Sequence, residues 1–176
     1  HAFSNAPVCS VARTTLLTGA YGPRIGAQYH RRSRLVPMPD GGQMYPWYLQ
    51  QAGYYTTNNS KTDYNVIVDQ GWDESSLDAS WRGRQEGQPF FHMQNTALTH
   101  ESSLHFTHEE MMNVENSTSS ESITLFPYFP DTPTFRYTHA RYLDNHLKVD
   151  NYFSEYLVML EEDGVLDDTF IFYFGD

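Results

Sequence analysis

The sequence from residue 6 to residue 19 reads Ala6-Pro-Val-Cys-Ser-Val-Ala-Arg-Thr-Thr-Leu-Leu-Thr-Gly19 and is the most informative stretch of the chain. It predicts a helix over Ser10–Thr18 that stops at Gly19, because glycine commonly follows the last residue of a helix. Cys9 then stands at the helix N-terminus, with Arg13 one turn later on the same side. Backbone N–H groups, the helix dipole and a guanidinium all favour negative charge there. The stretch therefore suits either a nucleophile that attacks a tetrahedral anion or a low-pKa thiolate.

Working outward from this stretch, glycine and proline punctuate the chain into further helices and strands. The sequence predicts a helix over Pro46–Gln51, strands over Tyr54–Asn58 and Pro89–Thr96, a long helix from about Phe135 to Glu162, and a strand over Thr169–Phe174. A strand, a long helix and another strand indicate parallel crossover connections. We therefore expect an α/β fold with a mostly parallel central sheet sandwiched by helices.

The long predicted helix has an apolar face with residues three or four positions apart. This face is formed by Leu143, Leu147, Asp150, Phe153, Leu157 and Leu160. Asp150 is then either a buried and hydrogen-bonded polar group or a residue at the edge of the face. Between the regular elements, residues 101–121 are typical of a solvated excursion, and residues 126–133 of an extended, proline-punctuated linker.

The composition excludes several classes of protein. The chain has 176 residues, a formal net charge of −11 and one cysteine, which rules out an internal disulfide framework and a multi-cysteine zinc site. The acidic balance argues against a general nucleic-acid binder. No apolar run approaches the roughly 20 residues that span a bilayer. Because the sequence starts at His1 and stops at Asp176 directly after an apolar run, we expect a fragment that is incomplete at both ends.

The motifs around Cys9 resemble those of the type I sulfatases of the alkaline phosphatase superfamily. The matching residues are Cys9-Ser-Val-Ala-Arg13, Leu17-Thr-Gly19 and Tyr21-Gly-Pro-Arg-Ile-Gly26. The family signature is Cys (or Ser)-x-Pro/Ala-x-Arg followed by an apolar helix that ends Leu-x-Thr-Gly, so Val11 departs from it. The resemblance implies an alkaline phosphatase-like fold and a Cys9 that a separate maturation enzyme converts to formylglycine. Without these motifs, a lone cysteine is most often a small buried apolar side chain.

The resemblance continues along nearly the whole chain. Gln51-Ala-Gly-Tyr-Tyr-Thr-Thr-Asn-Asn-Ser-Lys61 is similar to the family's Gly-Tyr-x-Thr segment, which implies that Lys61 contacts sulfate; Thr62-Asp63 then stands where Trp-His is usual. The stretch from residue 90 to His100 is similar to a strand and loop that end in a histidine near the sulfate ester. Residues 160–176 are similar to the helix and strand before the family's metal-binding element, which implies that Asp176 is a metal ligand.

The resemblance implies a complete set of site residues. Cys9, Arg13, Lys61 and His100 would be catalytic, Lys61 and His100 would also bind substrate, and Asp176 and Cys9 would bind calcium, with magnesium as the alternative. Calcium is the expected hard cation for carboxylate oxygens. Asp176 at the C-terminal end of a strand also lies where α/β sheets place ligands.

Two further groups of residues leave alternatives open. Arg32 belongs to the basic cluster Tyr29-His-Arg-Arg-Ser-Arg34, which is either a solvated loop or a subsite for an anionic substrate. The histidines His100, His105 and His108 do not have the i, i+4 spacing of a helical zinc site, so a zinc centre is not expected.

The resemblance therefore implies a sulfuric ester hydrolase that acts on sulfate esters, with a sulfated small molecule or glycan as substrate and a periplasmic or secreted location. The alternatives are a sulfamate hydrolase, a phosphodiesterase or phosphonate monoester hydrolase of the same superfamily, and a non-catalytic protein that binds sulfated glycans. Val11 and Asp63 favour the last of these. Residues 1–176 form part of the catalytic domain in this interpretation. We expect them to be inactive alone and to bind calcium weakly, since the family's early pair of metal-binding aspartates is absent.

Overall fold

The computed structural model of the chain describes residues 4–67 and 71–176. It divides into two compact units. Unit 1 holds the chain up to Asn95 together with the C-terminal residues Phe172–Asp176, and unit 2 holds Thr96–Ile171. Each unit is described by itself below.

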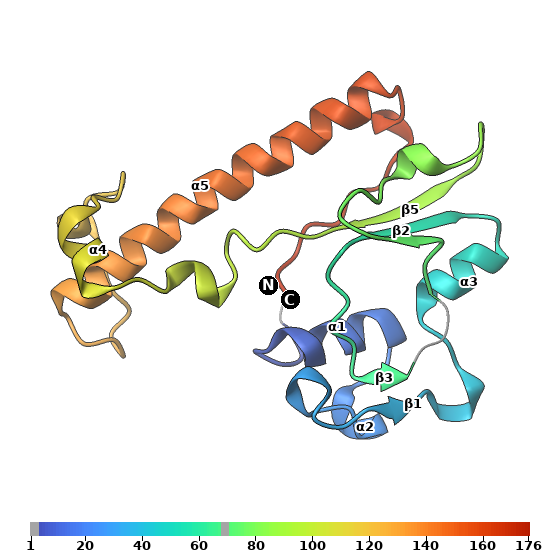
Figure 1. Cartoon of the computed structure of the whole chain (residues 1–176), viewed down its shortest axis with the longest axis horizontal. Coiled ribbons are helices and arrows are strands. Elements are labelled where there is room, and N and C mark those ends of the chain that lie inside the picture. The colour runs from blue at the N-terminus through green and yellow to red at the C-terminus, as the bar shows by residue number, and fades with distance from the viewer. Residues whose placement is uncertain (1–3, 68–70) are drawn as a thin grey trace. The chain divides into compact units, whose positions relative to one another are not determined.

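The helices and strands are labelled in Figure 1. The α-helices are α1 (Cys9–Thr18), α2 (Gly22–Ile25), α3 (Tyr45–Gln51), α4 (His108–Asn113) and α5 (Pro133–Glu162). The strands are β1 (Val36–Pro37), β2 (Tyr55–Asn59), β3 (Val66–Ile67), β4 (Glu74–Ser75) and β5 (Phe90–Gln94). Short 3-10 helices lie at His30–Arg32, Pro39–Gly41, Trp81–Gly83, Glu101–Leu104, Ser120–Ser122 and Leu166–Asp168.

The two predicted helices of unit 1 are confirmed. Helix α1 ends where Gly19 adopts a left-handed φ of +67° and donates its N–H to the carbonyl of Thr15. A side chain would be strained at that φ, which explains why glycine stands there. Helix α3 carries Pro46 in its first turn, where a backbone N–H has no intrahelical acceptor, so its absence in proline costs no hydrogen bond.

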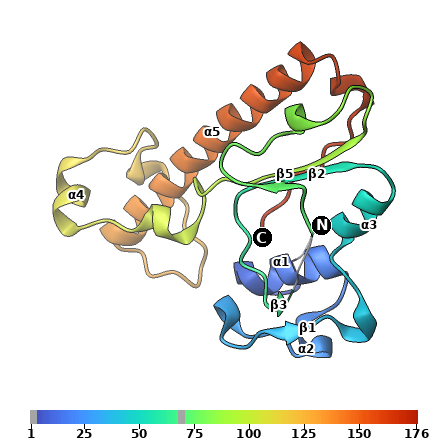
Figure 2. The same ribbon diagram turned by 45° about the vertical axis from the view of Figure 1, so that its right-hand side comes forward.

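Both sheets of unit 1 are parallel. Strand β2 lies between β4 and β5, and its residues from Tyr55 to Asn59 pair in register with Phe90 to Gln94 of β5. Strands β1 and β3 form a second, two-stranded parallel sheet. Figure 2 shows β2 and β5 side by side and α1 with β1 and β3. The predicted α/β class with parallel strands and the strands at 54–58 and 89–96 are thus confirmed, with small shifts at the ends.

The core of unit 1 joins α1 to both sheets. Its buried apolar residues are Leu17, Ala27, Val36, Met44, Tyr64, Val66 and Met93. The centre of β2 is buried but polar, since Thr56, Thr57 and Asn58 have no exposed surface. Buried polar groups are stable only when they are hydrogen-bonded. Strand β2 therefore contributes a fixed polar network as well as a sheet.

Unit 2 is built on α5, and the predicted helix over 135–162 is confirmed. It begins at Pro133, after Thr132, whose hydroxyl caps the N–H of Phe135. Helix α4 lies in the segment expected to be a solvated excursion, and Thr107 and Glu110 form a capping box at its start. No helix in the described part of the chain is long and apolar enough to cross a membrane.

The buried face of α5 differs from the predicted apolar face. Leu143, Leu147 and Asp150 are exposed. The buried residues are Tyr137, Ala140, Asn145, Val149 and Leu160. The prediction is confirmed at Leu160 and wrong at Leu143 and Leu147, and Asp150 is exposed, as a residue at the edge of the face would be. The apolar pattern does not reveal Asn145, which is buried and donates a hydrogen bond to the hydroxyl of Ser103 at 3.1 Å.

The predicted strand over Thr169–Phe174 is wrong. A 3-10 turn at Leu166–Asp168 precedes it, and the residues after that turn are irregular. A strand needs a partner for its backbone groups, and no described strand pairs with this segment. Its apolar side chains consequently remain in solvent, with Phe170 92% and Phe172 81% exposed. The last residues nevertheless return to α1, as both ribbon views show (Figures 1 and 2).

Candidate functional site

The cysteine of the motif lies in the first turn of α1 and faces a carboxylate. The Cys9 thiol is partly exposed and donates a hydrogen bond to Oδ2 of Asp63, with 3.2 Å between the two atoms. Asp63 has a left-handed φ of +47°, which is uncommon for a residue with a side chain. Sequence reasoning gave Asp63 no role, because it only marked the absence of the family's histidine at that position.

The arginine of the motif ties the loop that carries Asp63 to α1. Its side chain is only 5% exposed. Arg13 Nη2 donates to the carbonyl of Lys61 at 2.6 Å, and Nε donates to the carbonyl of Thr62 at 3.5 Å. Asn58 of β2 donates to the same Lys61 carbonyl at 3.2 Å. One buried guanidinium thus fixes residues 61–63 beside Cys9.

Lys61 and Arg13 converge on one oxygen atom. Oδ2 of Asp176 lies 3.0 Å from Arg13 Nη1 and 3.1 Å from Lys61 Nζ, and the Asp176 side chain is 26% exposed. Burial raises the pKa of Asp176, but the hydrogen bonds and charges of Arg13 and Lys61 outweigh it and hold that pKa below its ordinary value. The structure therefore brings four of the predicted site residues, Cys9, Arg13, Lys61 and Asp176, into one region of unit 1.

The predicted calcium ligands do not form a metal site by themselves. No three His, Cys, Asp or Glu residues gather into a metal-binding group in residues 4–67 and 71–176. Calcium takes 6–8 oxygen ligands, roughly, whereas the Asp176 oxygen described above faces two cations. The residues present in this chain thus do not fit a complete calcium site, and the ligand roles of Asp176 and Cys9 stay predictions.

Ser10 and Asn65 connect α1 to the basic cluster, and sequence reasoning missed both. Ser10 is fully buried, and its hydroxyl accepts the backbone N–H of Arg31 at 2.9 Å and bonds Nδ1 of His30 at 3.0 Å. Asn65 is also fully buried and accepts the backbone N–H of Arg32 at 2.9 Å. The available signal in the sequence was the position of each residue: Ser10 directly follows the motif cysteine, and Asn65 is a polar residue between Tyr64 and Val66.

The last predicted site residue, His100, belongs to unit 2. Its Nδ1 is paired with the hydroxyl of Ser102 at 2.8 Å and also accepts the backbone N–H of Ser102. These bonds place His100 at the start of the 3-10 helix Glu101–Leu104. The structure does not relate His100 to Cys9, so its role near a sulfate ester stays a prediction.

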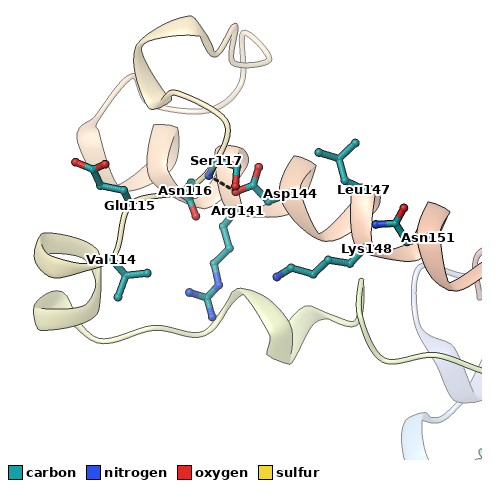
Figure 3. Close-up of a pocket in the computed structure, with 9 residues that line it drawn as sticks. All are labelled: Val114, Glu115, Asn116, Ser117, Arg141, Asp144, Leu147, Lys148 and Asn151. Atoms are coloured by element: carbon teal, nitrogen blue, oxygen red, sulfur yellow. Dashed lines mark hydrogen bonds between the residues drawn. The ribbon is translucent and has the colours of Figure 1, made fainter.

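Unit 2 also contains a pocket of about 370 Å³ beside α5. Figure 3 shows the side chains of Arg141 and Lys148 on one side of α5 and Asp144 bonded to Ser117. Both carboxylate oxygens of Asp144 accept hydrogen bonds from residues 117 and 118, which fixes the loop that forms the rim. None of the predicted site residues lines this pocket.

Comparison with known proteins agrees with the motif. The chain is 32% identical over 217 aligned positions to an ulvan-active sulfatase of Formosa agariphila. The match covers 99% of this chain and 36% of that protein, so the chain spans about a third of the relative's length. No family model matches the chain.

Proposed function

We propose that this chain, which belongs to the sulfatase family, is part of a formylglycine-dependent sulfuric ester hydrolase. The family membership rests on a match to a sulfatase along 99% of the chain. The fold around it would be alkaline phosphatase-like, with residues 1–176 as part of the catalytic domain. The substrate would be a sulfated carbohydrate, and the protein would be periplasmic or secreted.

The convergence of Lys61 and Arg13 on one carboxylate oxygen carries the proposal. A sulfate group spreads its negative charge over oxygens, and preorganised cations stabilise such charge without reorganising during the reaction. The same two cations lie in the unit that holds Cys9, and Arg13 positions the loop from which Lys61 projects. Lys61 would bind the sulfate of the substrate, while the buried Arg13 would neutralise it and hold the site together.

The position of Cys9 suits the modified residue that the family uses. Once hydrated, formylglycine would supply one hydroxyl group that attacks sulfur while the bond from sulfur to the alcohol oxygen breaks, which is covalent catalysis by a protein nucleophile. Its second hydroxyl would then lose its proton as sulfate leaves, and the aldehyde would be restored. Asp63 would accept a hydrogen bond from the side chain at position 9, as it does from the thiol. The carboxylate would thereby fix the orientation of that side chain toward the ester.

The remaining roles follow from the family match. His100 would donate a hydrogen bond or a proton near the leaving oxygen. Arg32 would bind an anionic part of the substrate, and Asp176 and Cys9 would contribute ligands to calcium or magnesium. A formylglycine-generating enzyme would be the maturation partner.

Peptide mass spectrometry of the segment that contains Cys9 tests the proposal most directly. Protein produced together with a formylglycine-generating enzyme should lose the cysteine sulfur and gain an aldehyde at position 9. Cys9→Ala should abolish hydrolysis of an aryl sulfate and keep the circular dichroism of the parent. An unmodified thiol in all of the protein would instead favour a non-catalytic protein that binds sulfated glycans.

Turnover of matched substrates separates the proposal from its nearest alternative. The full-length protein, which is the form used for every kinetic test, should hydrolyse an aryl sulfate faster than the corresponding aryl phosphate diester, phosphonate monoester or sulfamate. Faster turnover of either phosphorus ester would assign the chain to a phosphodiesterase or phosphonate monoester hydrolase. Retained activity in Cys9→Ala would remove this cysteine from the mechanism altogether.

A further inference from the structure

The loop Tyr29–Arg34 is fixed to the residue that follows the proposed nucleophile. Its backbone donates to two fully buried side chains, from Arg31 to the hydroxyl of Ser10 and from Arg32 to the amide oxygen of Asn65, both at 2.9 Å. Ser10 lies directly after Cys9 in α1. The loop therefore has a defined position relative to the first turn of that helix.

Two consecutive arginines of this loop occupy a backbone conformation that other residues adopt more easily. Arg31 has φ +46° and Arg32 has φ +61°. For a residue with a side chain, the left-handed region costs about 1–2 kcal/mol relative to glycine. Glycine or asparagine would satisfy the same backbone bonds at lower cost. The backbone conformation therefore does not itself favour arginine at either position.

The three arginine side chains of this loop point into solvent. Arg31, Arg32 and Arg34 are exposed, and their guanidinium groups form no hydrogen bond or ion pair with other residues in the part of the chain that the structure describes. The first 39 residues of the sequence contain five arginines and no aspartate or glutamate, although the whole chain has a net charge of −11. The loop is thus a local positive region in an acidic protein.

We propose that this loop is a second oxyanion subsite, in which Arg31 and Arg32 bind a sulfate or carboxylate group other than the one that is hydrolysed. The preferred substrate is then a polyanionic saccharide with at least two negative groups. Planar guanidinium groups pair with two oxygens of such a group at once, which gives orientation as well as attraction. This inference rests on the proposed function, because it takes the region of Cys9 as the place where one sulfate is cleaved.

The test compares the selectivity of variants that keep the backbone of the loop. Arg31→Asn and Arg32→Asn remove the charge and suit a left-handed φ, and the corresponding Lys variants keep the charge. KM is measured for an aryl sulfate, a disulfated disaccharide and a monosulfated disaccharide with one uronic acid. In the double Asn variant, the ratio of KM for either two-anion substrate to KM for the aryl sulfate should rise about tenfold or more. In the Lys variants this ratio should rise less than in the Asn variants. In the control Arg24→Asn, at an exposed arginine of α2, the ratio should not change.

The two saccharides distinguish the second anionic group. A larger loss for the disulfated substrate assigns the subsite to sulfate, and a larger loss for the uronic acid assigns it to carboxylate. An unchanged ratio in the double Asn variant would overturn the inference, even if hydrolysis itself is confirmed.

Binding without turnover separates this inference from the proposed function. In Cys9→Ala, isothermal titration with the disulfated disaccharide should show about tenfold weaker binding when Arg31 and Arg32 are also changed to Asn. That result would support the subsite even if no sulfatase activity were found. Equal binding with and without the two arginines would contradict it.

Discussion

At the scale of single residues, the buried side chain of Asn65 connects the segments that form the candidate site. Asn65 donates to the carbonyls of Ala27 and Tyr29 and accepts from Arg32, and its own N–H donates to the hydroxyl of Thr14 on α1. This one residue joins α1, the basic loop and the chain before β3. Such a network stabilises a structure only when every member is satisfied.

Asn65→Ala should lower the free energy of unfolding by about 2–4 kcal/mol, because it leaves two buried carbonyls and an N–H without their partner. Chemical denaturation measures this value. The control Asn151→Ala, at an exposed position of α5, should change it by less than about 0.5 kcal/mol. Equal effects of the two substitutions would show that the network contributes nothing to stability.

Asp63 is the residue whose substitution should affect the proposed reaction without affecting the fold. Asp63→Gly removes the acceptor that faces the side chain at position 9 and suits the left-handed φ of +47°. A loss of orientation should lower kcat by about 10²-fold with a smaller change in KM. Steady-state kinetics on an aryl sulfate, with conversion of Cys9 checked by mass spectrometry, measures the effect. Unchanged kcat at full conversion would show that Asp63 does not take part.

At the scale of elements, the sequence predicted what local patterns determine. Helix α1 was predictable because Gly19 ends it, and β2 because aromatic and β-branched residues favour a strand. The segment 169–174 has the same composition as a strand, but none of the strands that the structure describes pairs with it, which no local pattern reveals. The grouping of Cys9, Arg13 and Lys61 was predictable from the family motif. The roles of Ser10, Asp63 and Asn65 were not, because they depend on contacts between distant segments.

The stability of unit 1 should depend on pH because His92 of strand β5 is partly buried. Burial lowers the pKa of His92 below its ordinary value of 6.5, although a hydrogen bond with Gln94 opposes this. The unfolded chain then binds a proton at higher pH than the folded chain does. Stability from this group is complete above about pH 6.5 and is lost as the pH falls toward the folded pKa.

Denaturation of the parent and of His92→Gln at a series of pH values measures this contribution. The difference between the two proteins should shrink as the pH falls below about 6.5, by about 1.4 kcal/mol for each pH unit that separates the folded and unfolded pKa values. His146→Gln, at an exposed position of α5, is the matched control. A difference that does not vary with pH would contradict the prediction.

At the scale of the whole molecule, the chain holds the anion-binding half of the proposed chemistry more completely than the metal-binding half. Two cations and the motif cysteine lie together in unit 1, whereas no group of three metal ligands is found in residues 4–67 and 71–176. The match to about a third of a longer sulfatase is consistent with this imbalance. Activity and metal binding are therefore properties to be measured on longer and shorter forms of the protein.

Residues 1–176 alone should bind calcium weakly and turn over an aryl sulfate at no more than the background rate. Isothermal titration with calcium chloride, before and after treatment with a chelator, measures the first property. The control is Asp150→Asn, at an exposed position of α5 that has no proposed role in metal binding, which should leave the heat of binding unchanged. Micromolar affinity, or measurable hydrolysis, would show that the site is complete within this chain.

The shared oxygen of Asp176 has a consequence for how salt should act on the protein. An oxyanion that binds between Lys61 and Arg13 would replace the carboxylate of Asp176 as their partner, and not water. The two cations would therefore exchange one anionic partner for another. The exposed arginines of the loop Tyr29–Arg34 instead gain a counterion, and salt screens such exposed attractions strongly. The affinity for a substrate with one anionic group should therefore depend on ionic strength less than the affinity for a substrate with two.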